Sequence, residues 1–505
     1  MSEKASELGD KVVGAIQNNV TQALGLIYGL GMLTWTAFSQ MNSNYWSYFL
    51  TEVCGLEPTV MGTVKGITGV GEWFFVIIAA IIIERVWLRH GQYRSWLLIA
   101  PPITFVCLLM TFVDPFFLDQ GAKTVWMIGF QIVGGFFSSF FMIAATSIVP
   151  VISRTEADRT LLSQRKAQGN MLVKVLFAAV SLPAILAING LVYSVPAGEN
   201  AQNAGPAGFT VLAIIFGVFM IAMFFVMYKR IDGMDPTQKI CEERAAAKKR
   251  GEKVPPIDAG EKANIGEMIK YWITNLPAVI GLFSEIIRFI AQMTIMSMAM
   301  YVFAYAFGDV KMTAVMLTAC NITGLVATFI SEPIARKLGI RITYLAGIGI
   351  SFVFALACLL IGASGMMTFI VCICGISFGM SFMNGTMMGM QSNAIAYGEW
   401  RDGKTAKAFI MSTFQWCPKI ANAVAGVLTG FGLASIGFVS GMEATPELAQ
   451  GMITIICLIP AVCFGIAFVA FFFGYRLTPK KMEQISADLA EREAEKKLKE
   501  AEAQA

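Results

Sequence analysis

The chain has 505 residues, of which 56% are hydrophobic and 14% are charged, and its formal net charge is +4. Soluble domains carry about 25% charged residues, so this composition excludes an ordinary soluble domain and indicates a membrane protein with many spanning helices. No nucleic-acid-binding patch is visible, and the single histidine, His90, argues against a His-based metal site or a Ser-His-Asp triad. We expect no cofactor, no metal and no enzymatic activity, and we expect the ten cysteines to be buried free thiols.

Twelve apolar segments come close to or exceed the length that a spanning helix needs, about 20 residues. They are predicted at residues 22–50, 58–86, 97–115, 124–152, 167–191, 208–229, 275–305, 311–335, 342–363, 367–395, 406–436 and 451–475. The predicted fold class is therefore an all-α membrane protein with twelve transmembrane helices. The stretch YGEWRDGKTAK (397–407), at the junction of the tenth and eleventh segments, is expected to form a charged loop.

A hydrophilic stretch after the sixth segment divides the chain into halves. We predict a cytoplasmic N-terminus (1–21), a six-helix bundle (22–229), a cytoplasmic linker (230–274), a second six-helix bundle (275–475) and a charged cytoplasmic tail (476–505) that forms a solvated helix. The N-terminus has no signal-peptide pattern. Lys and Arg concentrate in the loops on one side of the membrane, which predicts a multi-pass protein of the inner membrane with both termini in the cytoplasm.

The two halves echo each other weakly. The second span of the first half ends in IIIERVWLRHGQYR (81–94), and the second span of the other half ends in ISEPIARKLGIR (330–341). Each stretch has an acidic residue near the inner end of the helix, followed by Arg, Gly and Arg. Repeated halves of this kind are typical of secondary transporters.

Polar residues recur at helical spacing in the first span. An intramembrane charge costs roughly 2.5–3.5 kcal/mol, so polar stripes require partners or a water-filled cavity. Thr36 and Gln40 share one face of the helix, and Trp35 lies beside them. This face forms either the wall of a hydrated cavity or a set of interhelical hydrogen bonds.

The second and fifth spans carry charges. Glu72 either binds a coupling ion, because a desolvated carboxylate can hold a proton, or pairs with another helix of its half. Lys65, on the same face, either points into the same cavity or reaches the outer interface. Arg165 and Lys166 open the fifth span as interfacial or functional residues, and Lys174 lies deeper, where we predict that it contacts substrate.

The second half carries an acid–base pair and a polar stripe. Glu285 and Arg288, three residues apart, either neutralise each other structurally or form a gate or substrate clamp. In the tenth and eleventh spans, amides, an indole and an ammonium group offer stacking and hydrogen bonding to a sugar. Those predicted to contact substrate are Asn393, Gln415, Trp416 and Lys419. In the alternative interpretation, Lys419 is only a salt-bridge partner and does not contact substrate.

Four stretches carry a resemblance to a known family. They are YWSYFLTEVCGL (45–56), RHGQYRSWLLIAPP (89–102), SIVPVISRTEADR (147–159) and AYGEWRDGKTAKAFIMSTFQWCPKIANAVAGVLTGFGLASIGF (396–438). With them, the chain resembles the glycoside–pentoside–hexuronide:cation symporters, the branch of the major facilitator superfamily that contains the melibiose and glucuronide permeases. The resemblance extends over all twelve spans, and its last motif is specific.

The resemblance implies a fold and roles for several residues. The fold is two six-helix bundles around a central cavity, working by alternating access. Lys419 matches the helix-11 lysine near the sugar and cation sites, Glu72 matches the first helix-2 acid of the cation site, and Ser139 occupies the position of a cation-site threonine. Gating or structural roles fall to the charged motif residues Arg89, Arg94, Arg165, Lys166 and Glu399.

Departures from the family pattern bear on coupling and substrate. The second helix-2 acid falls on Val76, the sugar-binding helix-4 aspartate on Met142 and the signature aspartate on Ala396. A Na⁺ site needs several oxygen ligands, whereas a proton needs one carboxylate, so we expect H⁺ coupling over Na⁺, or uncoupled transport. The remaining cations suit an anionic substrate such as a hexuronide, and a neutral glycoside stays open.

The predicted function is import of a sugar derivative, a glycoside, pentoside or hexuronide, by a monomeric cation-coupled symporter in the lipid bilayer. A carrier of lipid, lysolipid or another organic anion with the same fold is the first alternative. A membrane-embedded enzyme and a sensor that binds without transporting are the others. The polar stripes favour a small hydrophilic substrate.

Overall fold

The structure is a computed structural model, and it describes residues 2–86, 88–147, 156–194, 205–233, 237–250, 270, 272–402, 410 and 413–504. The described residues divide into two compact units. One contains residues 1–60 and 70–260, and the other contains residues 61–69 and 261–505. The helix over residues 58–85 therefore contributes to both units. The domain boundaries expected from the sequence stay predictions.

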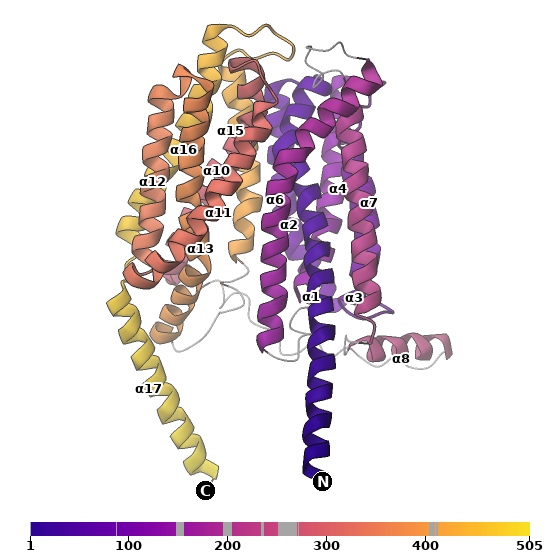
Figure 1. Ribbon diagram of the computed structural model, residues 1–505, viewed down its shortest axis with the longest axis vertical. Helices are drawn as coiled ribbons and strands as arrows, with labels where there is room; N and C mark the ends of the chain where they lie inside the picture. The colour runs from indigo at the N-terminus through magenta and orange to yellow at the C-terminus, as the bar shows by residue number, and fades with distance from the viewer. Residues whose placement is uncertain are drawn as a thin grey trace. The chain divides into compact units, whose positions relative to one another are not determined.

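The first unit is a helical bundle (Figure 1). Aromatic side chains contribute to its core. Its elements are α1 (Ser2–Tyr48), η1 (Phe49–Val53), most of α2 (Pro58–Arg85), α3 (Arg94–Met110), α4 (Gln120–Ser147), α6 (Glu156–Tyr193), α7 (Ala207–Arg230) and α8 (Thr237–Arg250). Helix α1 packs on α6 and α7, and α3 packs on α4 and α7. Phe49 and Tyr45 are fully buried and each meets the ring of Phe209 edge-on.

The second unit is a bundle of the same kind, joined by residues 61–69 of α2. Its own elements are α10 (Leu276–Tyr301), η3 (Val302–Ala306), α11 (Met312–Leu338), α12 (Ile340–Ile361), η4 (Gly362–Ser364), α13 (Met366–Asp402), η5 (Phe414–Trp416), α15 (Cys417–Ser435), α16 (Pro446–Gly474) and α17 (Pro479–Gln504). Helix α12 packs on α13 and α16, and α10 packs on α15 and α16.

Helices occupy the positions of all twelve predicted spans. Ten stretches of the described chain are long and apolar enough to cross a membrane. Helix α3 is a shorter apolar helix, and α1 extends the first predicted span to Ser2. Large apolar side chains such as Phe219 and Val462 lie exposed on these helices, as expected for surfaces that face lipid tails.

Three local predictions require correction. The charged loop expected after residue 395 is helical as far as Asp402, because α13 runs on through Tyr397 and Trp400. The eleventh span, expected as one helix over 406–436, has a 3₁₀ turn at Phe414–Trp416, and α15 begins only at Cys417. No disulfide joins the ten cysteines, all of which the structure describes, but three of them, Cys320, Cys374 and Cys463, are half-buried rather than buried.

The sequence echo between the halves has a structural counterpart. The first helix of each half, α1 and α10, ends in a π-helical turn, η1 and η3. A glycine with positive φ closes each turn, Gly55 at 69° and Gly308 at 70°. Backbone N–H groups bond back five residues in both, from Cys54 to Phe49 and from Phe307 to Val302. The two halves are therefore structural repeats in this element.

Candidate functional site

Glu72, the predicted cation-coupling residue, lies in a cluster of polar side chains from three helices, α1, α2 and α4. Its side chain on α2 is buried, and its Oε1 accepts a hydrogen bond from Gln131 Nε2 on α4 at 3.1 Å. Gln131 Oε1 in turn accepts from Asn42 Nδ2 on α1 at 3.1 Å. Gln131 is thereby oriented by both neighbours, with its amide donating to the carboxylate. Sequence reasoning missed Gln131, which interrupts an apolar run, and Asn42, which lies among the polar residues of the stretch 39–44 in the first span.

Two features of α4 bring Ser139 near Glu72. A Cβ placed on Gly135 would lie only 2.8 Å from Glu72 Cγ, so the absence of a side chain lets the carboxylate side chain pack on α4. Ser139 is buried one turn further on and donates its hydroxyl to the Gly135 carbonyl at 3.0 Å. Glu72 of α2 thus packs on Gly135 of α4, one helical turn away from Ser139, the other predicted cation-coupling residue.

The polar face of α1 is partly committed to interhelical hydrogen bonds. Thr36 donates to Asn170 Oδ1 on α6 at 2.8 Å, so this contact fits the structural alternative for that face. The Trp35 ring meets Phe141 edge-on at 4.9 Å between centroids. Gln40 on α1 and Lys174 on α6 are half-buried. The side chains of Arg165 and Lys166, on α6, lie outside the described ones.

Lys65 belongs to the second unit, although Glu72 on the same helix belongs to the first. It is 2% exposed, which does not fit the outer interface predicted as one alternative. Its Nζ lies 3.5 Å from Ser297 Oγ on α10. A Cβ on Gly426 of α15 would lie 2.3 Å from Lys65 Cβ, so the small residue makes room for the lysine.

The start of α15 carries the aromatic and cationic residues predicted to contact substrate. Trp416 ends the 3₁₀ turn, Pro418 occupies the first turn of the helix, and both Trp416 and Lys419 are half-buried. The Cys417 thiol lies 3.9 Å from the Leu282 carbonyl, which seats this end of α15 against α10.

The other predicted substrate contacts are separate or undescribed. Asn393 is half-buried on α13, next to Ala394, whose carbonyl accepts from Asn275 Nδ2 at 2.7 Å. The backbone of Gln415 lies in η5, and its side chain lies outside the described ones. Asn393 and Lys419 therefore come from different helices, α13 and α15.

Glu285 and Arg288 form a fully buried ion pair on α10. Both side chains have zero exposure, and the closest N–O distance is 2.8 Å. Glu285 Oε2 accepts from Arg288 Nε and Nη2, and Oε1 accepts from the Tyr344 hydroxyl of α12 at 2.9 Å. Arg288 Nη1 donates to Gln292 at 3.4 Å. The pair is therefore neutralised and fully engaged within its unit, and Tyr344 is a third member that sequence reasoning missed.

Most of the remaining charged motif residues lie at helix ends. Arg94, which is buried, donates from Nε to the Tyr228 carbonyl at 3.0 Å and pairs with Asp232 at 2.7 Å. A hydrogen bond from Gln238 and the Arg94 charge hold the pKa of the Asp232 carboxyl below its usual range. Arg89 is exposed, and Glu399 is half-buried in the last turns of α13.

The tail helix α17 packs against the end of α13. Asp488 accepts from the Trp400 indole at 2.8 Å, and Arg492 Nη1 donates to the Trp400 carbonyl at 2.8 Å. Ile485 is buried, with 1% of its surface exposed. The predicted tail is a helix, as expected, but its first half is attached to the YGEW motif rather than solvated on all sides.

Comparison with known proteins gives a family match over most of the chain. A family model described as MFS/sugar transport protein matches residues 27–479. The isoprimeverose transporter of Lactiplantibacillus pentosus is 23% identical over 459 residues, covering 90% of this chain and 88% of that protein. A glucuronide carrier protein homolog of Escherichia coli is 21% identical over 487 residues, covering 95% and 94%.

Solved structures show the same fold at lower identity. The crystal structure of a D-xylose-proton symporter superposes with a TM-score of 0.58 at 12% identity, and the match covers 90% of this chain and 98% of that one. At that identity, the match carries the architecture alone.

Proposed function

Because the chain belongs to the MFS/sugar transport protein family, it is a multi-pass membrane transporter rather than an enzyme, and we propose that it imports an anionic sugar derivative, such as a hexuronide, by cation-coupled alternating access. We further propose that it works as a monomer in the inner membrane with both termini in the cytoplasm. The isoprimeverose transporter and the glucuronide carrier homolog support a sugar-type substrate.

The observation that carries the anionic substrate is the start of α15. There the 3₁₀ turn Phe414–Trp416 passes directly into α15, whose first turn contains Pro418, and this places Trp416 and Lys419 three residues apart on one side of the helix. Trp416 supplies a ring on which a sugar face stacks, and Lys419 supplies the ammonium group for its carboxylate. Both residues are half-buried, which fits side chains that contact a substrate during transport and are exposed after its release.

The geometry around Glu72 supports H⁺ rather than Na⁺ as the coupling ion. Gln131 offers the carboxylate an N–H, which cannot be a Na⁺ ligand, while its amide oxygen is engaged by Asn42. The hydroxyl of Ser139 donates to a backbone carbonyl. A Na⁺ site needs several oxygen ligands, whereas a proton needs one carboxylate, so this cluster fits H⁺ better than Na⁺.

The first experiment measures binding with the Lys419→Gln variant in detergent. A charge-assisted hydrogen bond contributes roughly 1.5–3 kcal/mol, so the variant is expected to bind a uronide about 10- to 100-fold more weakly. Its affinity for a neutral glycoside changes little. Lys311→Gln, at an exposed lysine next to α11, is the matched control. Unchanged uronide affinity in Lys419→Gln would refute this role.

The second experiment measures uptake in vesicles under separate pH and Na⁺ gradients. We expect a pH gradient to drive uptake and Glu72→Gln to abolish that drive while leaving substrate exchange at equal concentrations. Uptake driven by Na⁺ and insensitive to pH would overturn the assignment. A thermal-stability screen with uronides, neutral glycosides and lysolipids tests the substrate class. If only lysolipids stabilise the protein, its substrate is a lipid rather than a sugar derivative.

A further inference from the structure

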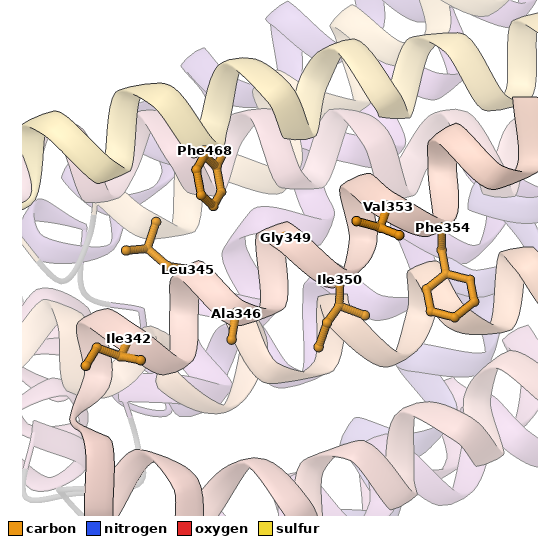
Figure 2. Close-up of a pocket in the computed structure, with 8 residues that line it drawn as sticks. All are labelled: Ile342, Leu345, Ala346, Gly349, Ile350, Val353, Phe354 and Phe468. Carbon is orange, nitrogen blue, oxygen red and sulfur yellow. The ribbon is translucent and has the colours of Figure 1, made fainter.

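An apolar groove runs along the lipid-facing side of α12 and α16. Its volume is about 590 Å³, and Figure 2 shows Phe468 of α16 above the side chains of α12 that form its floor. Ile342 and Val353, 46% and 62% exposed, lie towards its two ends. The lining contains no charged residue: it consists of Ile342, Leu345, Ala346, Gly349, Ile350, Val353, Phe354 and Phe468. This groove is separate from the polar clusters described above.

A guanidinium lies at one end of the groove. Arg341 directly precedes Ile342, and its Nε and Nη2 donate to the carbonyls of Tyr475 and Phe472 at the end of α16, at 2.7 and 2.9 Å. The guanidinium carbon lies 5.8 Å from the centre of the Phe472 ring, and that ring stacks on Phe468 in the groove. The sequence contains no Asp or Glu in 333–343 or 448–482.

In the first half of the chain, Arg94 makes the equivalent contact and also pairs with a carboxylate. Arg94 Nε donates to the Tyr228 carbonyl, and Arg341 Nε donates to the Tyr475 carbonyl, each across 134 residues of sequence. Arg94 Nη1 then pairs with Asp232, four residues beyond the bonded carbonyl. At the corresponding place in the second half stands Pro479. Among the described side chains, no carboxylate pairs with Arg341.

We propose that this groove binds one glycerophospholipid with an anionic headgroup. The lipid phosphate pairs with Arg341, as the Asp232 carboxylate pairs with Arg94. One acyl chain lies along α12 from Ile342 to Phe354. That distance is about 18 Å at 1.5 Å per residue, close to one leaflet of the roughly 30 Å hydrocarbon core. The basic end and apolar length of the site match the two parts of such a lipid.

Native mass spectrometry of the purified full chain tests the proposal, with dioleoyl phosphatidylglycerol and dioleoyl phosphatidylcholine as probes. We expect one retained phosphatidylglycerol, bound about fivefold more tightly than phosphatidylcholine, the factor that corresponds to about 1 kcal/mol per basic residue. Gly349→Trp fills the groove and loses this lipid. A Cβ at Gly349 meets only Phe468 Cε2 at 3.9 Å, so the helix accepts it.

Two further variants separate the parts of the site. Gly129→Trp adds the same bulk at an exposed glycine of α4 with open space around it, and it is expected to bind like the wild type. Pro479→Asp restores the carboxylate of the first repeat, so the preference for phosphatidylglycerol disappears while the fold stays. Equal binding of both lipids by the wild type, retention of the lipid in Gly349→Trp, or a dimer that Gly349→Trp dissociates would overturn the proposal.

Discussion

The buried ion pair on α10 gives the sharpest prediction. Glu285→Gln removes the negative charge but keeps the shape of the side chain. Arg288 is fully buried, its guanidinium lies 4.0 Å from the centre of the Phe289 ring, and Glu285 supplies two of its hydrogen bonds. The substitution therefore leaves a buried cation without its counter-charge.

The expected magnitude follows from that uncompensated charge. Removing one partner of a buried pair costs about 3–5 kcal/mol, and Tyr344→Phe, which deletes one hydrogen bond to the carboxylate, costs about 1–3 kcal/mol. The double variant Glu285→Leu with Arg288→Met removes both charges. Its free energy of unfolding is expected to lie near that of the wild type or above it, since no lone charge remains.

The assay is the free energy of unfolding in detergent micelles, measured for the wild type, Glu285→Gln, Arg288→Met, Tyr344→Phe and the double variant. The reasoning is refuted if Glu285→Gln unfolds at the wild-type free energy, or if the double variant is as unstable as either single one. Uptake by the double variant then separates the two alternatives for the pair: a structural pair leaves transport intact, and a gate or substrate clamp does not.

Three other predictions concern the ends and contacts of helices. Because the folded state lowers the pKa of Asp232, its contribution to stability is present above the ordinary carboxyl range and is lost as pH falls through the lowered pKa; melting of Asp232→Asn and the wild type therefore converges below about pH 4. Asp488→Ala removes the acceptor for the Trp400 indole, and faster hydrogen exchange in the first turns of α17 reports the loosened helix. Gly69→Leu places a side chain where a Cβ already lies 2.6 Å from Ala423 Cβ, so a lower melting temperature is expected than for Gly129→Leu.

The fold was predictable because length and apolarity decide which segments cross a membrane. A helix occupies each predicted span. The predicted boundary was wrong where a helix continues into polar sequence. Tyr397–Asp402 reads as a loop, yet Asp488 and Arg492 of α17 hold Trp400 at the end of α13. Such a contact between segments far apart in the chain leaves no trace in local composition.

The sequence predicted single residues of the candidate site but not their hydrogen-bond partners. A buried charge in an apolar run indicates that a partner exists, which identified Glu72, Lys419 and the α10 pair. It does not indicate which partner. Gln131 is an isolated amide in an apolar stretch of α4, and Tyr344 is an ordinary aromatic residue by its sequence. Periodicity orders residues within one helix, whereas hydrogen bonds between helices depend on the packing.

The distribution of charges along α2 supports a route for coupling. Glu72 has its described partner in the first unit, and Lys65, two turns earlier, contacts Ser297 of the second. An α-helix transmits displacement along its axis because its backbone hydrogen bonds are internal. If protonation of Glu72 alters its hydrogen bond to Gln131, the shift of α2 reaches the contacts of Lys65 with α10 and α15. With the proposed proton site at Glu72 and the proposed substrate site at Lys419, coupling through α2 requires no direct contact between the two sites, because residues of α2 belong to both units.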